Sequence, residues 1–283
     1  MRRIYLALIV ILYVTSVSAQ HNKQVSKAQL ENFKKSTTYV VTENNPMIGY
    51  DIVVKSAFPK YWKITPFKFI TPDEFEKLRK NKNNSFVLLA REKLTKDPEG
   101  PDYQYLNFLM GDSVNSVNDM PEILTIPLCY SGSDENSYTY KIGGMLRFAQ
   151  EHIKVLQAAR LLWTYKNLTY YNMNTPEIKK KTLLIESADL AEEVNTAEKI
   201  KALYPYDVKI VNSEAIESAI DNKTPNTLIL HVVNPGKEDK VGRSYKIIYG
   251  VDDNKMYYYN YENISSIYPA GFLAKDFKRL SWK

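Results

Sequence analysis

The fold is decided by residues 181–261, which read KTLLIESADLAEEVNTAEKIKALYPYDVKIVNSEAIESAIDNKTPNTLILHVVNPGKEDKVGRSYKIIYGVDDNKMYYYNY. Three short apolar runs lie within this stretch: 182–185, 208–211 and 227–233. Their polar flanks are typical of strands that are buried on both faces. Residues 189–203 place apolar side chains at steps of three or four, which predicts a helix. A second, short helix is predicted after Asn212 or Ser213, since either residue suits an N-cap.

Two further strand-like runs close this unit. Residues 244–249 and 255–261 flank Asp252, Asp253 and Asn254, a composition typical of a hairpin turn. The predicted order is therefore strand, helix, strand, helix, strand, hairpin. Alternation of this kind predicts an α/β fold with mixed sheets and with helices packed on the sheets.

The first half of the chain carries a diverged copy of the unit. A shift of 141 residues brings 67–70 onto 208–211, and it needs no gap across residues 67–90. The predicted helix at 72–80 then falls on 213–221. Five positions are identical in this alignment: Lys68/Lys209, Glu76/Glu217, Asn81/Asn222, Lys82/Lys223 and Leu89/Leu230.

Elements outside the gapless match agree in their order. Residues 37–41 match 182–186 after a small insertion, and 103–110 take the place of 244–249. We therefore predict two tandem repeated βαβαβ-plus-hairpin units that arose by duplication. Chance similarity between two ordinary βαβ segments is the alternative.

The repeat sets the expected organisation of the chain. We predict a signal peptide at 1–19, a flexible lead-in at 20–35, a first unit with its closing helix at 36–168, a linker at 169–181 and a second unit at 182–283. The closing helix is predicted over 142–165. A strand at 122–129 contains Pro127, which indicates the edge of a sheet.

The first residues read as an export signal. Arg2 and Arg3 precede an apolar core at 4–14, and small residues lead to a predicted cut after Ala19. Gln20 then follows where a lipoprotein would have Cys. We expect a periplasmic or secreted protein that is not a lipoprotein and has no transmembrane segment in its mature chain. An uncleaved membrane anchor is the alternative.

The charge balance argues against nucleic-acid binding. The net charge is +6 for the whole chain, and loss of Arg2 and Arg3 with the signal would leave +4. The charges are scattered, and residues 179–181 form the only basic run. We therefore predict no nucleic-acid partner.

No catalytic or metal-binding motif is recognisable. Cys129 is the one cysteine, and no histidine stands in a motif relationship to it, so we expect a buried, unreactive thiol. No carboxylate or histidine cluster has metal-ligand spacing. We assign no catalytic residues, no metal and no cofactor. A binding protein is favoured, although an enzyme class without a readable motif stays open.

Polar residues follow the predicted parallel strands of the second unit. They are Glu186, Asp189, Asn212, Ser213 and His231. Ligands of open α/β sheets bind at the carboxyl ends of the strands, so these residues are the candidate ligand site. Helix N-caps have the same composition, and capping is the alternative explanation.

Tyrosine is over-used, with 22 Tyr against 10 Phe. Five tyrosines fall on the predicted hairpin: Tyr245, Tyr249, Tyr257, Tyr259 and Tyr261. A stripe of this kind suits contact with proteins or glycans, since Tyr combines flat apolar area with a polar tip. Tyr is also an ordinary residue of half-buried strands, which is the alternative.

The element order of each half, carried by 182–185, 208–211 and 227–233, resembles the N-terminal domain of the TolB type and the related curli-secretion lipoproteins. That resemblance implies an envelope interaction domain. The order is also similar to a tandem thioredoxin-like fold, but the chain has no Cys-x-x-Cys to support redox work. Residues 203–209 (LYPYDVK) and 245–250 (YKIIYG) resemble uncharacterised exported proteins of Gram-negative gut bacteria, which have no known activity.

Two binding hypotheses follow. The first is an exported, non-enzymatic binding or assembly protein of the cell envelope, with envelope proteins or glycans as partners. The second is a periplasmic small-molecule-binding protein, with its ligand between the units or at the strand ends near His231. A cleft at the strand ends would favour the second hypothesis, and an exposed apolar patch would favour the first.

Overall fold

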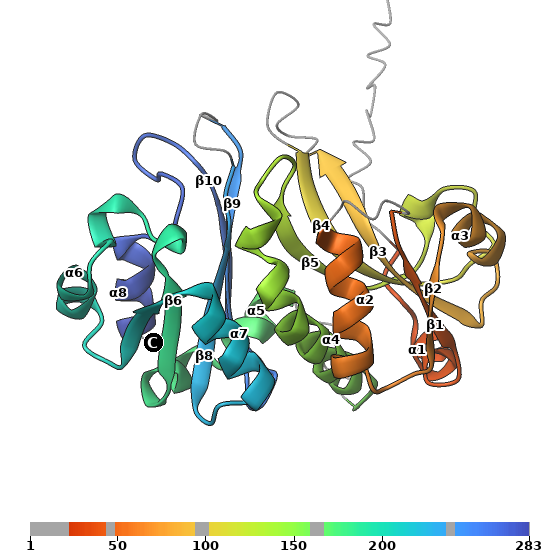
Figure 1. Cartoon of the computed structure of the whole chain (residues 1–283), viewed down its shortest axis with the longest axis horizontal. Helices are drawn as coiled ribbons and strands as arrows, with labels where there is room; N and C mark the ends of the chain where they lie inside the picture. Colours follow the sequence, from red (N-terminus) through yellow and green to blue (C-terminus); the bar gives the residue numbers. More distant parts are fainter. Residues whose placement is uncertain (1–22, 44–48, 94–101, 159–166, 236–240, 283) are drawn as a thin grey trace, which may run out of the picture.

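Two five-stranded mixed sheets with helices on their faces form the protein (Figure 1). The structure is a computed structural model, and it describes residues 23–43, 49–93, 102–158, 167–235 and 241–282. The predicted α/β class and mixed sheets are confirmed. The predicted signal peptide, 1–19, lies outside the described residues.

The two sheets have the same strand order. The first runs β2-β1-β3-β4-β5 and the second β7-β6-β8-β9-β10. The first three strands of each sheet are parallel, and a hairpin adds the remaining antiparallel strands. The strands are β1 (Thr37–Val41), β2 (Phe67–Ile70), β3 (Asn84–Lys93), β4 (Asp102–Met110), β5 (Glu122–Tyr130), β6 (Thr182–Glu186), β7 (Val208–Val211), β8 (Thr227–Val233), β9 (Arg243–Gly250) and β10 (Met256–Asn263).

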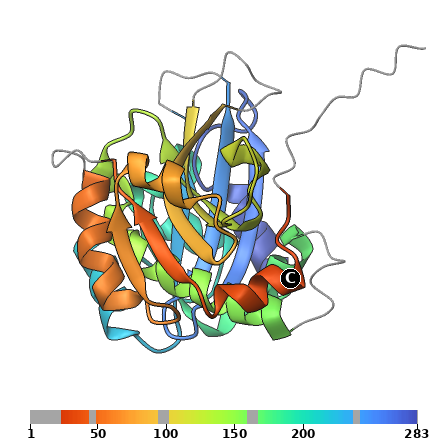
Figure 2. The same ribbon diagram turned by 90° about the vertical axis from the view of Figure 1, so that its right-hand side faces the viewer.

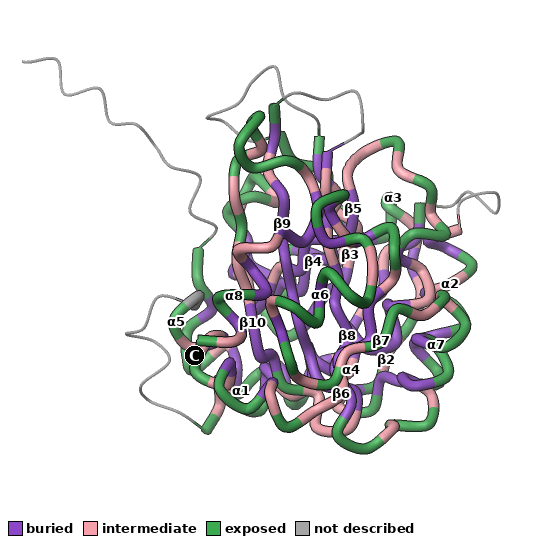
Figure 3. Tube along the Cα trace, turned by 90° about the vertical axis from the view of Figure 1, so that its left-hand side faces the viewer, coloured by how far each residue is buried: buried purple, intermediate pink, exposed green. Residues whose placement is uncertain are grey.

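Helices cover the outer faces of the sheets and also lie at the contact surface between the two units, which we call the join (Figures 1 and 2). They are α1 (Lys27–Phe33), α2 (Gly49–Tyr61), α3 (Pro72–Leu78), α4 (Ile142–Ala158), α5 (Asn167–Asn172), α6 (Ala197–Leu203), α7 (Ser213–Asn222) and α8 (Ala274–Trp282). Figure 3 shows the central strands buried and the outer turns of the helices exposed. This is the layered arrangement expected of strands that are apolar on both faces.

Equivalent residues of the two units contact each other. Glu92 of β3 pairs with Tyr103, and Val233, 141 positions later, pairs with Tyr245. The rings of Tyr103 and Tyr245 lie edge to face, with centroids 5.7 Å apart. A contact between equivalent positions is the signature of an isologous interface. The join therefore resembles a symmetric dimer interface within one chain, as the predicted repeat implies.

The start of α4 is wedged between the units. A Cβ on Gly143 would lie 2.5 Å from the ring of Tyr61, and one on Gly144 would lie 2.6 Å from the ring of Tyr249. Tyr61 belongs to the first unit and Tyr249 to the second. The glycine pair is therefore needed for close packing of this helix.

One apolar core runs through both units. Trp62 and Phe108 of the first unit belong to the same buried cluster as Ile229 and Ile247 of the second. A separate cluster under α6 and α8, around Phe277, stabilises the outer half of the second unit. The two units therefore share a core and are not separate domains connected by a linker.

The segment predicted as a flexible lead-in, 20–35, is folded in its described part, from Lys23 onward. Ser26 and Gln29 form a capping box that starts α1, and Leu30 and Phe33 are buried. The backbone N–H of Val25 donates to the carbonyl of Glu122 at 3.0 Å, which covers part of the open edge of β5. The low apolar content of this segment concealed two residues that are well placed to pack.

The single helix predicted over 189–203 is also wrong. Two short 3-10 turns, Ser187–Asp189 and Glu192–Val194, precede α6, which starts at the N-cap Thr196. The chain between the two turns pairs with Phe272. The backbone N–H of Phe272 donates to the carbonyl of Asp189 at 2.8 Å, and the carbonyl of Phe272 accepts from the N–H of Ala191 at 3.1 Å. This long-range pairing overrides the helical pattern of the sequence.

Three further segments can be compared with the prediction. The first unit has a helix, α2, between β1 and β2, where the second unit has α6 between β6 and β7, and its buried Tyr50, Val54 and Phe58 follow helical spacing. The predicted linker 169–181 is folded: α5 and the 3-10 helix Thr175–Lys180 pack beside β10. The closing helix is α4, and its predicted part beyond residue 158 lies outside the described residues. The edge strand containing Pro127 is confirmed as β5.

Candidate functional site

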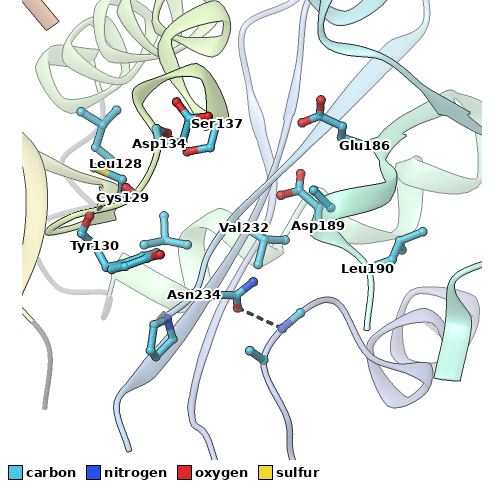
Figure 4. A pocket seen from close by; sticks show the side chains of 16 residues that line it. Leu128, Cys129, Tyr130, Asp134, Ser137, Glu186, Asp189, Leu190, Val232 and Asn234 are labelled. Carbon is cyan, nitrogen blue, oxygen red and sulfur yellow. Dashed lines mark hydrogen bonds between the residues drawn. The ribbon is translucent and has the colours of Figure 1, made fainter. Parts of the chain in front are cut away.

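A cavity of about 410 Å³ lies between the two units (Figure 4). The end of β5 and the loop after it form one wall, and the carboxyl ends of β6 and β8 form the other. The segment before α8 closes the base. Its lining residues are Leu128, Cys129, Tyr130, Ser133, Asp134, Ser137, Glu186, Ala188, Asp189, Leu190, Val232, Val233, Asn234, Pro235, Ala270 and Gly271.

Three carboxyl groups line the cavity. Asp134 comes from the first unit, and Glu186 and Asp189 come from the second. The ammonium of Lys141, which is completely buried, lies 2.8 Å from Asp189 Oδ2. Burial raises the pKa of Asp189, and the Lys141 ammonium opposes that effect. The Tyr140 hydroxyl donates to Glu186. Lys141 and Tyr140 therefore hold two of the cavity's carboxylates in place from across the join.

Asn234 fixes the base of the cavity. Its side-chain Oδ1 accepts from the backbone N–H of Gly271 at 2.9 Å, drawn dashed in Figure 4, and from the hydroxyl of Ser244 at 2.7 Å. Gly271 has a φ of +108°, a left-handed conformation that favours glycine. The end of β8 and the segment before α8 are therefore locked together.

Cys129 lines the cavity as an unreactive thiol. Its Sγ donates to the Gln104 side chain at 3.2 Å. Burial raises the pKa of Cys129 to about 11, with the nearby Glu135 carboxylate adding to the rise. The group is therefore protonated at neutral pH, and a protonated thiol is a poor nucleophile.

His231 lies at the join and does not line the cavity. Its Nε2 is 3.0 Å from the carbonyl of Pro127 on the edge strand β5. Burial, together with the nearby charge of Lys141, lowers the pKa of His231 to about 3, so the ring is neutral at pH 7. Nε2–H then donates to Pro127. The imidazole joins the two units and has no direct access to a ligand.

The structure brings together only part of the predicted ligand site. Glu186 and Asp189 line the cavity, and His231 lies deeper at the join. Asn212 and Ser213 lie elsewhere, at the start of α7, where the Asn212 side chain accepts from the N–H of Ala215 at 3.1 Å. The capping explanation therefore fits Asn212, and Ser213 is the first residue of the helix.

The predicted tyrosine surface is mostly inaccessible. Tyr245, Tyr249 and Tyr257 are buried, and Tyr259 is half-buried. Only Tyr261 is exposed, at 41%. The Tyr245 hydroxyl lies 2.8 Å from that of Tyr105, in the join.

A bulge in β10 explains why the stripe does not form. Met256 pairs with Tyr249, and Tyr258 pairs with Ile248, so Tyr257 is an extra residue in the ladder. The alternation assumed for the stripe is therefore broken at Tyr257. Its side chain packs with Tyr258 in the second unit's own core, whereas Tyr259 faces the shared core.

The first-unit wall of the cavity was not predicted. Asp134, Ser137 and the buried Lys141 belong to a polar loop and a helix start that carry no local signal of a site. Only the packing of one unit against the other brings them opposite Glu186. The predicted repeat could have pointed to the contact between the two units in general, but not to these side chains.

No protein-family model matches the chain, and neither curated proteins nor solved structures include a significant match. Among the described residues, no group of three or more His, Cys, Asp or Glu side chains could hold a metal ion. Each helix in the described ranges is too short or too polar to cross a bilayer.

Proposed function

We propose that this protein is an exported, non-enzymatic binding protein that holds a small ligand in the cavity between its two units. One observation carries the proposal: a cavity of about 410 Å³ lies at the carboxyl ends of β6 and β8. That volume is within the range of small-molecule sites. The apolar residues of its lining, such as Leu128 and Val232, would contact the body of the ligand.

The polar lining favours a ligand with an amino group. Asp134, Glu186 and Asp189 bring three carboxyl groups to the cavity, and Lys141 pairs with one of them. The remaining negative charge attracts a cation and repels an anion. The Asn234 amide and the hydroxyls of Ser133 and Ser137 would add hydrogen bonds to polar groups of the ligand.

A pair of neighbouring tryptophan substitutions tests the site. Ala188 and Ser187 are both exposed and lie in the same 3-10 turn, but only Ala188 lines the cavity. Thermal shifts would be measured with putrescine, arginine, glucose and citrate as probes. We expect a saturable shift with an amine, lost in Ala188→Trp and kept in Ser187→Trp. Equal shifts in both variants, or a response to citrate alone, would contradict the proposal.

Envelope proteins or glycans remain the second candidate, favoured by exposed side chains beside the end of β10. Ile267 is 77% exposed and Tyr268 is 43% exposed. The guanidinium of Arg243 lies 4.4 Å from the centre of the Tyr261 ring, which is also exposed. Aromatic and Arg side chains are enriched at protein interfaces. A photo-crosslinking residue at Ile267 would capture an envelope protein if this candidate is right, and one at exposed Glu214 is the control.

A further inference from the structure

A second cavity, of about 160 Å³, lies where α4, α5 and the turn between β9 and β10 meet. Its aromatic and apolar lining residues are Phe148, Val155, Tyr170, Tyr171, Met173 and Met256, and its polar ones are Glu151, His152, Asn174, Asn254 and Lys255. An apolar cavity of roughly 150 Å³ holds one benzene molecule in another protein. The space therefore matches one six-membered ring.

One buried polar side chain lines this space. His152 is only 7% exposed, and its Nδ1 lies 3.5 Å from the Tyr171 hydroxyl, at the limit of a hydrogen bond. Burial lowers the pKa of His152 to about 4, so the ring is neutral at pH 7 and carries one donor and one acceptor nitrogen. No described residue is hydrogen-bonded to Nε2, which leaves that nitrogen for a ligand.

The walls of the cavity are fixed relative to one another. Asn172 of α5 makes two hydrogen bonds to the backbone of Tyr259, at 2.9 and 2.8 Å. Asn174 donates to the carbonyl of Met256 at 2.8 Å. The rings of Phe148 and Tyr171 meet edge to face, with centroids 5.9 Å apart. A preformed cavity loses little conformational entropy when a ligand enters.

We infer that this cavity binds a single-ring aromatic molecule with one hydroxyl group, its ring against the aromatic walls and its hydroxyl bonded to His152. Aromatic walls favour a flat ring through edge and face contacts. A ring without the hydroxyl would leave Nε2 of the buried imidazole without a hydrogen-bond partner, which is unfavourable. The site shares no lining residue with the cavity between the units, so it does not depend on the proposed function.

The test is a titration of the whole protein with phenol, followed through the ¹³C-methyl signals of Met256 and Met173. Both methionines line the cavity. We expect saturable binding of one phenol, with shifts centred on these methyl groups. Toluene, which has nearly the same shape but no hydroxyl, should bind about three- to tenfold more weakly because it lacks the hydrogen bond. Non-saturating phenol shifts, or equal binding of the two molecules, would overturn the inference.

Substitutions locate the binding. Val155→Phe fills the cavity from a half-buried position and should abolish phenol binding, whereas Lys154→Phe, on the same helix but outside the lining, should not. Met173→Trp blocks the space from an exposed position and serves if Val155→Phe does not fold. His152→Leu should make phenol and toluene bind alike, and His152→Gln should restore part of the preference. Phenol shifts at Met256 that persist in both blocked variants would refute the site.

Discussion

At the residue scale, the ion pair between Lys141 and Asp189 is a buried contact between the two units. Both side chains are buried, and their charges lie 2.8 Å apart. Removing one partner leaves an unpaired buried charge, so we expect Asp189→Ala to lower the free energy of unfolding by about 3–5 kcal/mol. Urea unfolding at pH 7 measures this change.

The matched control replaces both partners. Lys141→Met combined with Asp189→Leu removes the pair without leaving a charge, and such replacements are often neutral. The double variant should therefore recover most of the lost stability. If it is as unstable as Asp189→Ala alone, the loss comes from packing, and the ion pair does not explain it.

The two buried histidines make stability depend on pH. The pKa values of His231 and His152 are lowered from 6.5 to about 3 and about 4, because burial disfavours the charged ring. The unfolded chain therefore binds more protons than the folded chain below pH 6.5. The stabilisation is present above that pH and is lost as the pH falls, by about 1.4 kcal/mol per pH unit for each histidine.

Urea unfolding at pH 6 and pH 5 checks the pH dependence. Above the pH range in which carboxylates titrate, the slope of the unfolding free energy against pH reports how many more protons the unfolded chain binds. His231→Gln should lower that number by about one and leave the contribution of His152. Its amide can still donate to the carbonyl of Pro127, so the join is kept. A slope that His231→Gln leaves unchanged would show that His231 is not buried in its neutral form.

Residue chemistry was the least predictable part of the molecule. The sequence identified Glu186 and Asp189 because they follow a strand, but the same rule selected Asn212, which caps α7, and Ser213, which begins it. A strand end and a helix start look alike in sequence. A strand end becomes part of a cavity only where another surface packs opposite it, and the surface opposite β6 comes from the first unit. Such packing depends on contacts between residues that are far apart in the sequence.

At the element scale, the start of α4 depends on having no side chain at Gly144. A methyl group there would meet the ring of Tyr249, which is buried and cannot move freely. Alanine is the better helix former by about 1 kcal/mol, yet we expect Gly144→Ala to destabilise the protein by about 1–3 kcal/mol through overpacking. Thermal unfolding measures the change, and Tyr249→Leu in the same chain should relieve it. A Gly144→Ala protein as stable as the original would contradict this packing.

The open edge of β10 is protected by one side chain of α5. Asn172 accepts from the N–H of Tyr259 and donates to its carbonyl, which satisfies both groups of an edge-strand residue. Unprotected edges promote aggregation. We expect Asn172→Ala to destabilise by about 1–3 kcal/mol and to increase light scattering on heating. Asn172→Asp can still accept one of the two hydrogen bonds, so its stability and its light scattering should lie between those of the original protein and of Asn172→Ala. Identical scattering by all three would refute the role of Asn172.

Elements were predicted best where the sequence pattern is local. The strands around 182–185, 208–211 and 227–233 form as predicted, because each is a short apolar run that needs only a sheet. The helix predicted at 189–203 failed, because pairing with Phe272 holds part of that stretch extended. Long-range backbone pairing leaves no signal in local hydrophobic spacing.

At the scale of the whole molecule, the repeat accounts for the way in which the two units contact each other. A shift of 141 residues relates 67–90 to 208–231, and Tyr103 and Tyr245, which pair with equivalent residues of β3 and β8, meet between the two sheets. A single apolar core then runs through both units. The predicted repeat thus anticipated two units with the same order of elements, although it could not give their relative orientation or the side chains that line the cavity.

The most direct test of the central claim is native mass spectrometry of the chain from Gln20 to Lys283, purified from its own host. We expect a monomer whose mass exceeds that of the polypeptide by a small, discrete amount, because the cavity between the units retains its ligand. The added mass should be absent from Ala188→Trp and present in Ser187→Trp. A bare monomer for all three proteins would contradict a retained ligand. A stable dimer would contradict a join completed within one chain.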